Sequence, residues 1–182
     1  MRPDPFLQAL PAGTELSDAV RALHSTCAQY SGRCTVTAGG GKLVALALRC
    51  ARMPPDGQDV EVKVSIVRDQ AGWIWTRNFG GHITQSRLNF DHRFDCVREQ
   101  FGPVSIWLKP VFSKDRLSVQ ILRLKFLGVP CPKLLLPRST TVEWQDERGR
   151  FRFDVSAEMP VLGPLIRYQG WLTSDHGQKG AG

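Results

Sequence analysis

Residues 60–66 read Val-Glu-Val-Lys-Val-Ser-Ile, and residues 73–79 read Trp-Ile-Trp-Thr-Arg-Asn-Phe. In the first segment every second side chain is apolar, which is typical of a β-strand with one buried and one solvated face. Residues 70–72 between the two segments are Gln-Ala-Gly, a connection short enough for a tight turn. This stretch therefore predicts a β-hairpin and an antiparallel, β-rich fold.

The rest of the chain extends this pattern on both sides of the hairpin. Strand candidates separated by turn-like links continue to residue 172, and a short one lies at residues 33–37. Upstream, apolar residues recur at helical spacing from Leu16 to Cys27, which predicts a helix there. The Ala- and Leu-rich residues 42–53 predict a second helix.

The predicted fold is α+β and mainly antiparallel β, a curved meander sheet or partly open barrel of about eight to nine strands with one or two N-terminal helices. We expect residues 42–53 to pack against the concave side of the sheet, because a long meander must either close or cover one face. The proline-rich residues 1–13 are interpreted as an irregular lead-in, residues 14–173 as a single domain, and the Gly-rich residues 174–182 as a flexible tail.

Composition and motifs argue against several classes of function. The formal net charge is +7, but the arginines are scattered along the 182 residues, so no specific nucleic-acid site is expected. Residues 39–42, Gly-Gly-Gly-Lys, look like part of a phosphate-binding loop, but Val36 and Leu43 stand where the motif needs other residues. No dinucleotide motif occurs, and no histidine or cysteine pair has metal-ligand spacing. We therefore expect neither a cofactor nor a metal.

The expected location is the cytoplasm. The first residues hold no apolar run of signal-peptide length, and no run in the sequence is long enough for a transmembrane segment. The five cysteines show no paired spacing, which is typical of free thiols in a reducing compartment.

The strand at residues 73–79 carries the most informative side chains. Alternation places four of them on one face: Trp73, Trp75, Arg77 and Phe79. We expect this largely aromatic face to point inward. An arginine among apolar groups needs a carboxylate or carbonyl partners, and Glu99 and Glu143 are the candidates.

Three roles remain open for this arginine. A buried ion pair can fix the register of the sheet. Alternatively, Arg77 can hold an acidic head group at the mouth of an apolar cavity. In the third reading, the partner glutamate is a general acid or base with a shifted pKa.

Two other features are ambiguous at this stage. His24 lies on the first predicted helix and is expected to be a structural hydrogen-bonding residue rather than a ligand. Residues 128–138 form a proline-rich connection with three leucines. Exposed, these leucines would form a patch that touches a partner or a membrane; otherwise they would cover a barrel mouth or pack onto the core.

Several short motifs follow one another along the chain: Trp75-x-Arg77-x-Phe79-Gly80-Gly81, Glu99-x-Phe101-Gly102-Pro103, Gly128-Val129-Pro130-x-Pro132, Glu143, Gly149-Arg150-Phe151 and Tyr168-x-Gly170-Trp171-Leu172. In this order and spacing they resemble the bacterial domain family DUF 4166. The resemblance implies a domain that occurs alone or fused behind a saccharopine-dehydrogenase-like reductase, and it brings no established catalytic residues. Cys131 and Trp107 depart from the usual pattern of the family without disturbing the match.

The expected function is a non-catalytic module that binds an apolar or amphipathic small molecule in a curved-sheet cavity. The candidate ligand-binding residues are Trp75, Arg77, Phe79, Glu99, Glu143, Tyr168 and Trp171. Two alternatives stay open, a docking domain for a reductase-type protein partner and an enzyme with an Arg-Glu site. No catalytic residue is assigned.

Overall fold

The computed structural model describes residues 3–175, and the expected flexible tail lies outside the described residues from residue 176 on. The helices are α1 (Pro5–Ala9), α2 (Asp18–Ser25), α3 (Lys42–Cys50) and the short 3₁₀ helix η1 (Lys133–Leu135). The strands are β1 (Gln29–Ala38), β2 (Gly57–Asp69), β3 (Gly72–Phe79), β4 (His82–Asp91), β5 (Cys96–Phe101), β6 (Val104–Ser113), β7 (Arg116–Phe126), β8 (Val129–Pro130), β9 (Arg138–Ser139), β10 (Thr141–Gln145), β11 (Phe151–Met159) and β12 (Gly163–Ser174).

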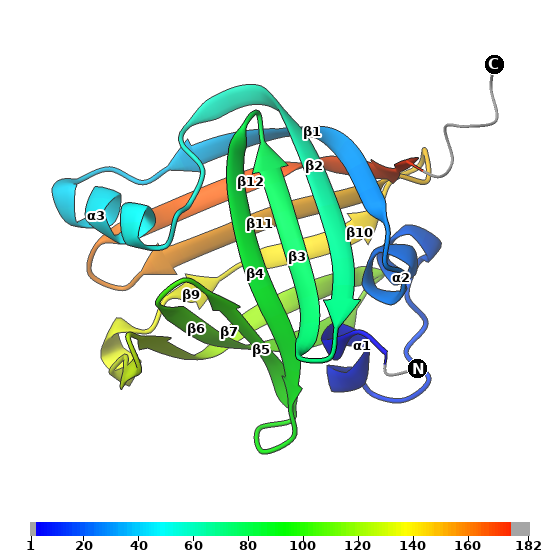
Figure 1. Cartoon of the computed structure of the whole chain (residues 1–182), viewed down its shortest axis with the longest axis horizontal. Helices are drawn as coiled ribbons and strands as arrows, with labels where there is room; N and C mark the ends of the chain where they lie inside the picture. The colour runs from blue at the N-terminus through cyan, green and yellow to red at the C-terminus, as the bar shows by residue number, and fades with distance from the viewer. Residues whose placement is uncertain (1–2, 176–182) are drawn as a thin grey trace.

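The antiparallel meander closes into a barrel of ten strands, β1–β7 and β10–β12 (Figure 1). The first and last of these strands, β1 and β12, pair from Tyr30↔Ser174 to Ala38↔Ile166. At the other junction, β10 pairs with β7 over three positions only. The mainly antiparallel β fold is confirmed, but the expectation of eight to nine strands or a partly open barrel was wrong. Local patterns show where strands are, whereas closure depends on pairing between the two ends of the domain.

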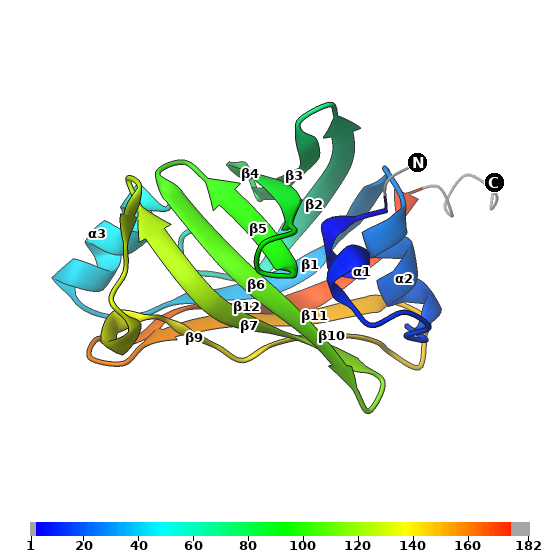
Figure 2. The same cartoon turned by 90° about the horizontal axis from the view of Figure 1, so that it is seen from below.

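Helices α1 and α2 cover one end of the barrel (Figure 2). The predicted lead-in at residues 1–13 is irregular only in part, because Pro5–Ala9 forms α1. The Asp4 side chain accepts a hydrogen bond of 2.7 Å from the Phe6 amide, and a proline occupies the first turn of α1. Both features favour helix initiation, so the prolines at this point start a helix instead of preventing one.

Helix α3 lies at the opposite end of the barrel, where it contacts β12 (Figure 1). The predicted helix exists, but its expected place on the concave side of the sheet was wrong. Closure turns that side into a barrel interior lined by large side chains, which leaves no room for a helix about 10 Å across. Val44 is the buried residue of α3, whereas Leu43 and Leu46 are exposed. No helix within residues 3–175 is long and apolar enough to span a membrane.

The interior is packed unevenly along the barrel axis. Near α1 and α2, inward-facing side chains such as Leu88 and Leu117 are completely buried. Toward α3, the paired residues Ile106 and Leu124 also face inward but keep accessible surface. Solvent reaches an inward-facing side chain only where other side chains do not fill the space in front of it. Phe79, beside the turn at residues 80–81 on the α3 side, is buried, so the incomplete packing at this end is confined to the wall that includes β6 and β7.

Candidate functional site

Strand β3 points its aromatic face and one arginine into the barrel. Trp73, Trp75 and Phe79 are at most 6% exposed and belong to the hydrophobic core. Arg77 lies between Trp75 and Phe79 on the same face, because alternate residues of a strand share a face. The fold thus places a cationic side chain among aromatic ones, as the alternation predicts.

The guanidinium of Arg77 has three partners in the interior. One terminal nitrogen lies 3.3 Å from a carboxylate oxygen of Glu99 on β5, and the other donates a 2.9 Å hydrogen bond to the hydroxyl of Ser86 on β4. The guanidinium carbon also lies 5.1 Å from the centre of the Trp75 ring. Of the two carboxylates suggested by the sequence, Glu99 is therefore the partner. The side chains of Arg77 and Glu99 remain 20% and 13% exposed, so solvent reaches this pair inside the barrel.

Glu143, the other carboxylate, pairs with His24 at the closed end of the barrel. The Nε2 atom of His24 lies 2.7 Å from Glu143 on β10, and its Nδ1 atom lies 3.6 Å from Asp4, the N-cap of α1. The first distance is a hydrogen bond, whereas the second is an ion-pair distance. This triad of His24, Glu143 and Asp4 ties both N-terminal helices to the barrel wall.

The two carboxyl groups hold a proton on His24. Burial by itself lowers the pKa of an imidazole, but the charge of Glu143 and the contacts with Asp4 and Glu143 outweigh that effect. The pKa of His24 is raised from 6.5 to about 10. His24 is therefore a buried cation at neutral pH, in keeping with the structural role that the sequence suggests.

Trp75 joins the two charged groups. Its ring centre lies 5.5 Å from that of His24 and 5.1 Å from the guanidinium carbon of Arg77. Its indole Nε1 atom is buried and finds no hydrogen-bond partner within residues 3–175. A buried indole N–H usually has a partner, so this donor is one of the unsatisfied polar groups of the interior.

Tyr168 of β12, three strands along the barrel from β3, faces the same space. Its ring packs edge-on against Phe79 and Phe153, with centroid distances of 5.6 and 6.2 Å. Burial raises the pKa of Tyr168 to about 12; the Arg77 charge opposes that rise, while Glu99 and Glu143 add to it. The phenol therefore remains protonated at neutral pH, and its pKa responds to charges from both polar groups.

The structure brings together six of the seven candidate residues: Trp75, Arg77, Phe79, Glu99, Glu143 and Tyr168. It places Trp171 elsewhere, under the Arg150 guanidinium at 4.8 Å, because alternation along β12 turns that side chain outward. Sequence reasoning missed Asp4 and Ser86 as members of the cluster. The Asp-Pro pair at residues 4–5 is a helix-start signal that could have drawn attention to Asp4.

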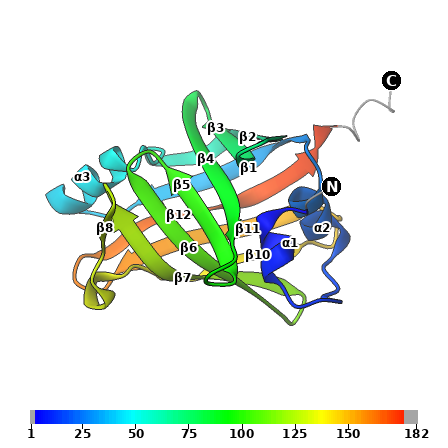
Figure 3. The same ribbon diagram turned by 60° about the horizontal axis from the view of Figure 1, so that its bottom comes forward.

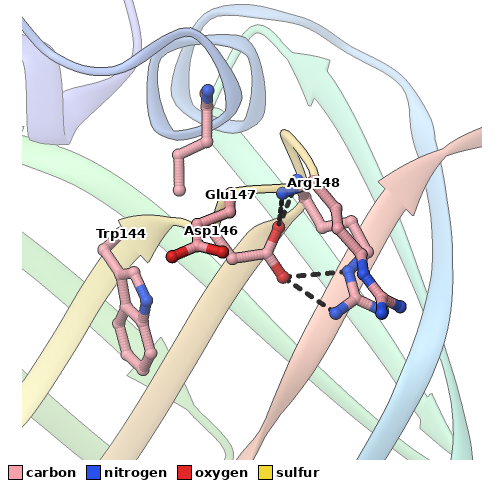
Figure 4. Close-up of a pocket in the computed structure, with 6 residues that line it drawn as sticks. Trp144, Asp146, Glu147 and Arg148 are labelled. Atoms are coloured by element: carbon pink, nitrogen blue, oxygen red, sulfur yellow. Dashed lines mark hydrogen bonds and ion pairs between the residues drawn. The ribbon is translucent and has the colours of Figure 1, made fainter.

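A shallow hollow of about 570 Å³ lies on the outside, at the turn between β10 and β11 (Figure 4). There the Asp146 carboxylate accepts hydrogen bonds from the amides of Arg148 and Arg150 and from the Arg150 guanidinium. These contacts are all within one turn and account for the geometry of the turn. Within residues 3–175, no group of three or more His, Cys, Asp or Glu side chains is arranged to hold a metal ion.

Comparison with other proteins places the chain in a family. Neither the search of curated proteins nor that of solved structures found a match. A family model described as a domain of unknown function matches residues 16–172. This range contains all ten barrel strands, apart from the last two residues of β12. The match includes His24, Arg77, Glu99, Glu143 and Tyr168, whereas Asp4 precedes it. The chain belongs to the DUF4166 family.

Proposed function

We propose that the barrel binds an amphipathic small molecule, with its apolar part toward α3 and its polar part at Trp75, Arg77 and Tyr168. The observation that carries this proposal is the unsatisfied, buried N–H of Trp75 in a polar cluster that solvent reaches. Between this cluster and the α3 end, part of the inward-facing wall is apolar and incompletely packed, as at Ile106 and Leu124. An apolar wall with a few convergent polar groups is the usual lining of a small-molecule site.

The charges in the cluster favour a neutral head group. Arg77 already faces Glu99, and His24 already faces Glu143 and Asp4. An acidic head group would have to displace Glu99 from Arg77 and leave that carboxylate unpaired, which is costly in a partly buried site. A hydroxyl or carbonyl oxygen can instead accept a hydrogen bond from the indole N–H of Trp75, and neither the Arg77 nor the His24 ion pair has to break.

Native mass spectrometry of the purified protein, followed by solvent extraction of any bound molecule, tests this proposal. We expect a bound species with a long apolar part and an uncharged hydrogen-bonding group. A clean apo mass, together with no uptake of an added long-chain alcohol, would overturn the proposal.

A conservative variant locates the binding site. Trp75→Phe keeps an aromatic ring but removes the N–H, so affinity for the extracted molecule should fall roughly fivefold, the value of one hydrogen bond. Trp144→Phe is the matched control, because Trp144 lies beside Arg116 and Arg152 in another part of the barrel. Equal affinities for both variants would place the ligand elsewhere.

Catalysis is the second candidate, favoured by the contact of Arg77 with Glu99 in the interior. A glutamate beside an arginine and reached by solvent can exchange a proton with a bound molecule. Incubation of the extracted molecule with the protein separates the two candidates. Recovery of the molecule unchanged supports binding alone, whereas conversion that is lost in Glu99→Gln supports an enzyme.

A further inference from the structure

Five connections meet at the α3 end of the barrel, and we call them together the α3 rim. With the barrel-strand residues directly next to them, they are residues 39–56, 80–83, 102–103, 125–140 and 158–163. Because neighbouring strands are antiparallel throughout, connections that alternate along the meander lie at the same end. Figure 3 shows α3 and β8 at this end, opposite α1 and α2.

The α3 rim concentrates the exposed apolar side chains of the protein. Six of them are more than 60% exposed: Leu43, Ile83, Leu127, Val129, Leu134 and Val161. Among residues 3–175, the large exposed apolar side chains outside this rim are Val67, Val111 and Leu122, and each is less than 50% exposed. Within the part of the chain that the structure describes, the connections at the α1–α2 end carry none. Scattered apolar residues need no explanation, but a set confined to one end indicates an interaction surface.

Leu127 is an exposed apolar side chain at a backbone position that favours other residue types. It begins the turn after β7 with a left-handed backbone, φ +50°, and Gly128 follows at φ +82°. Asparagine or glycine is usual at such a position, because a larger side chain is strained there. The Leu127 amide donates a 2.8 Å hydrogen bond to the carbonyl of Pro103, but its side chain is 72% exposed and gains no packing within the chain. The side chain is instead available to something outside the molecule.

The charges on the α3 rim are complementary to an anionic surface. Its cationic side chains are Lys42, Arg49, Arg52, Lys125, Lys133 and Arg138, and its carboxylates are Asp56 and Glu158. All of these cations are exposed, and within the described chain none is in an ion pair. The turns at the other end mix both signs, as at Asp146, Glu147 and Arg148.

We propose that the α3 rim docks the barrel end-on onto a lipid bilayer that contains anionic head groups. Apolar side chains that project beside lysine and arginine are typical of surfaces that lie on such membranes. The apolar tips come from separate connections around the barrel end. A bilayer accepts separate tips in any arrangement, whereas a protein partner needs one matching contour. The proposal extends the proposed function, because the less filled end of the interior would face the lipid.

Flotation with vesicles tests the docking. The purified chain is mixed with vesicles of phosphatidylcholine alone or of phosphatidylcholine with phosphatidylglycerol. We expect it to float with the anionic vesicles and to bind less as salt is raised. Leu127→Asp/Leu134→Asp should weaken binding roughly tenfold or more, since apolar burial and attraction are both lost. Val67→Asp/Leu122→Asp, two exposed apolar residues of the barrel wall, is the matched control and should bind like the wild type.

A second pair of variants tests the charge. Lys133→Glu/Arg138→Glu on the rim should weaken binding to anionic vesicles roughly tenfold or more, because each cation near the surface contributes. Arg93→Glu/Lys114→Glu makes the same change at the other end and should have little effect. All four residues are exposed, so these variants are expected to fold, which circular dichroism checks.

Three outcomes would overturn the docking proposal: no flotation of the wild type with anionic vesicles, rim variants that bind like the wild type, or control variants that lose binding equally. The proposal would also be overturned if the chain did not bind vesicles but bound a protein partner through Leu127 and Leu134. Extraction of a bound molecule tests the interior site independently of vesicle binding. A chain that floats but holds no extractable molecule keeps the rim proposal and removes the small-molecule one.

Discussion

At the scale of single residues, His24 makes the stability of the protein depend on pH. Its pKa is raised to about 10 in the folded chain, against 6.5 for an exposed histidine. Between these values the folded state holds a proton that the unfolded state has released, so stability falls as pH rises. Below pH 6.5 the contribution is fully present, and it is lost as pH rises through about 10.

Urea unfolding at several pH values measures this effect. Between pH 6.5 and pH 10 the unfolding free energy of the wild type should fall by a few kcal/mol more than that of His24→Gln, on the order of the shift at 1.36 kcal/mol per pKa unit. The variant serves as the control because all other groups titrate in both proteins. Parallel pH profiles would show that His24 is neutral in the folded state.

The ion pair of Arg77 with Glu99 should behave as a coupled unit. Arg77→Leu leaves a carboxylate unpaired in the interior, so the melting temperature should fall by roughly 5 °C, the equivalent of about 2 kcal/mol. Removing both charges in Arg77→Leu/Glu99→Leu should recover most of that loss. In the exposed pair Arg87–Asp69, the corresponding changes should have little effect, as for most surface ion pairs. A double variant no more stable than Arg77→Leu would contradict the coupling.

Side-chain alternation was enough to predict part of the site. It showed that Arg77 shares a face with Trp75 and Phe79 and needs a carboxylate, and Glu99 was one of two suggested partners. The His24 cluster could not be predicted in this way, because Asp4, His24 and Glu143 come from an N-cap, a helix and a distant strand. Only the tertiary fold brings such residues together.

At the scale of elements, the end of β1 depends on a glycine. A Cβ atom at Gly39 would overlap the carbonyl oxygen of Pro164, at the start of β12, whereas one at Gly40 would meet nothing within 4 Å. Gly39→Ala should therefore lower the melting temperature by roughly 5–10 °C. Gly40→Ala is the adjacent control and should leave it nearly unchanged. Similar melting temperatures would mean that the end of β1 can move away from β12.

The helices show what composition can and cannot predict. The Ala- and Leu-rich segment at residues 42–53 correctly predicted α3, because helix propensity is local. Its position at the barrel end was not predictable, since that depends on whether the sheet closes. For the leucines of residues 128–138, the sequence left open whether they are exposed, cover a barrel mouth or pack onto the core. In the structure the Leu134 side chain is 85% exposed.

At the scale of the whole molecule, closure rests on two unequal junctions. The β1–β12 pairing extends over nine positions, whereas β10 and β7 share only three. Helix α2 reinforces the short junction, through the His24–Glu143 contact and a 2.7 Å hydrogen bond from the Ala19 amide to Gln145. Sequence periodicity could not reveal either junction, because it carries no information on which distant strands pair.

Hydrogen exchange should detect the difference between the junctions. Amides of β10 are expected to exchange roughly tenfold faster than those in the middle of β1, because a short junction opens locally at lower cost. His24→Gln should accelerate exchange in β10 while leaving β1 unchanged. Uniform protection of both strands would show that the barrel opens only as a whole.

The two ends of the described chain lie at the same end of the barrel. Residue 3 precedes α1, and residue 175 follows β12 at the end where Ser174 pairs with Tyr30, close to α2 (Figure 1). Both ends therefore emerge on the side away from α3. A tether, a fluorescent label or a neighbouring domain attached at either end would therefore lie on the side away from the α3 rim and leave that rim uncovered.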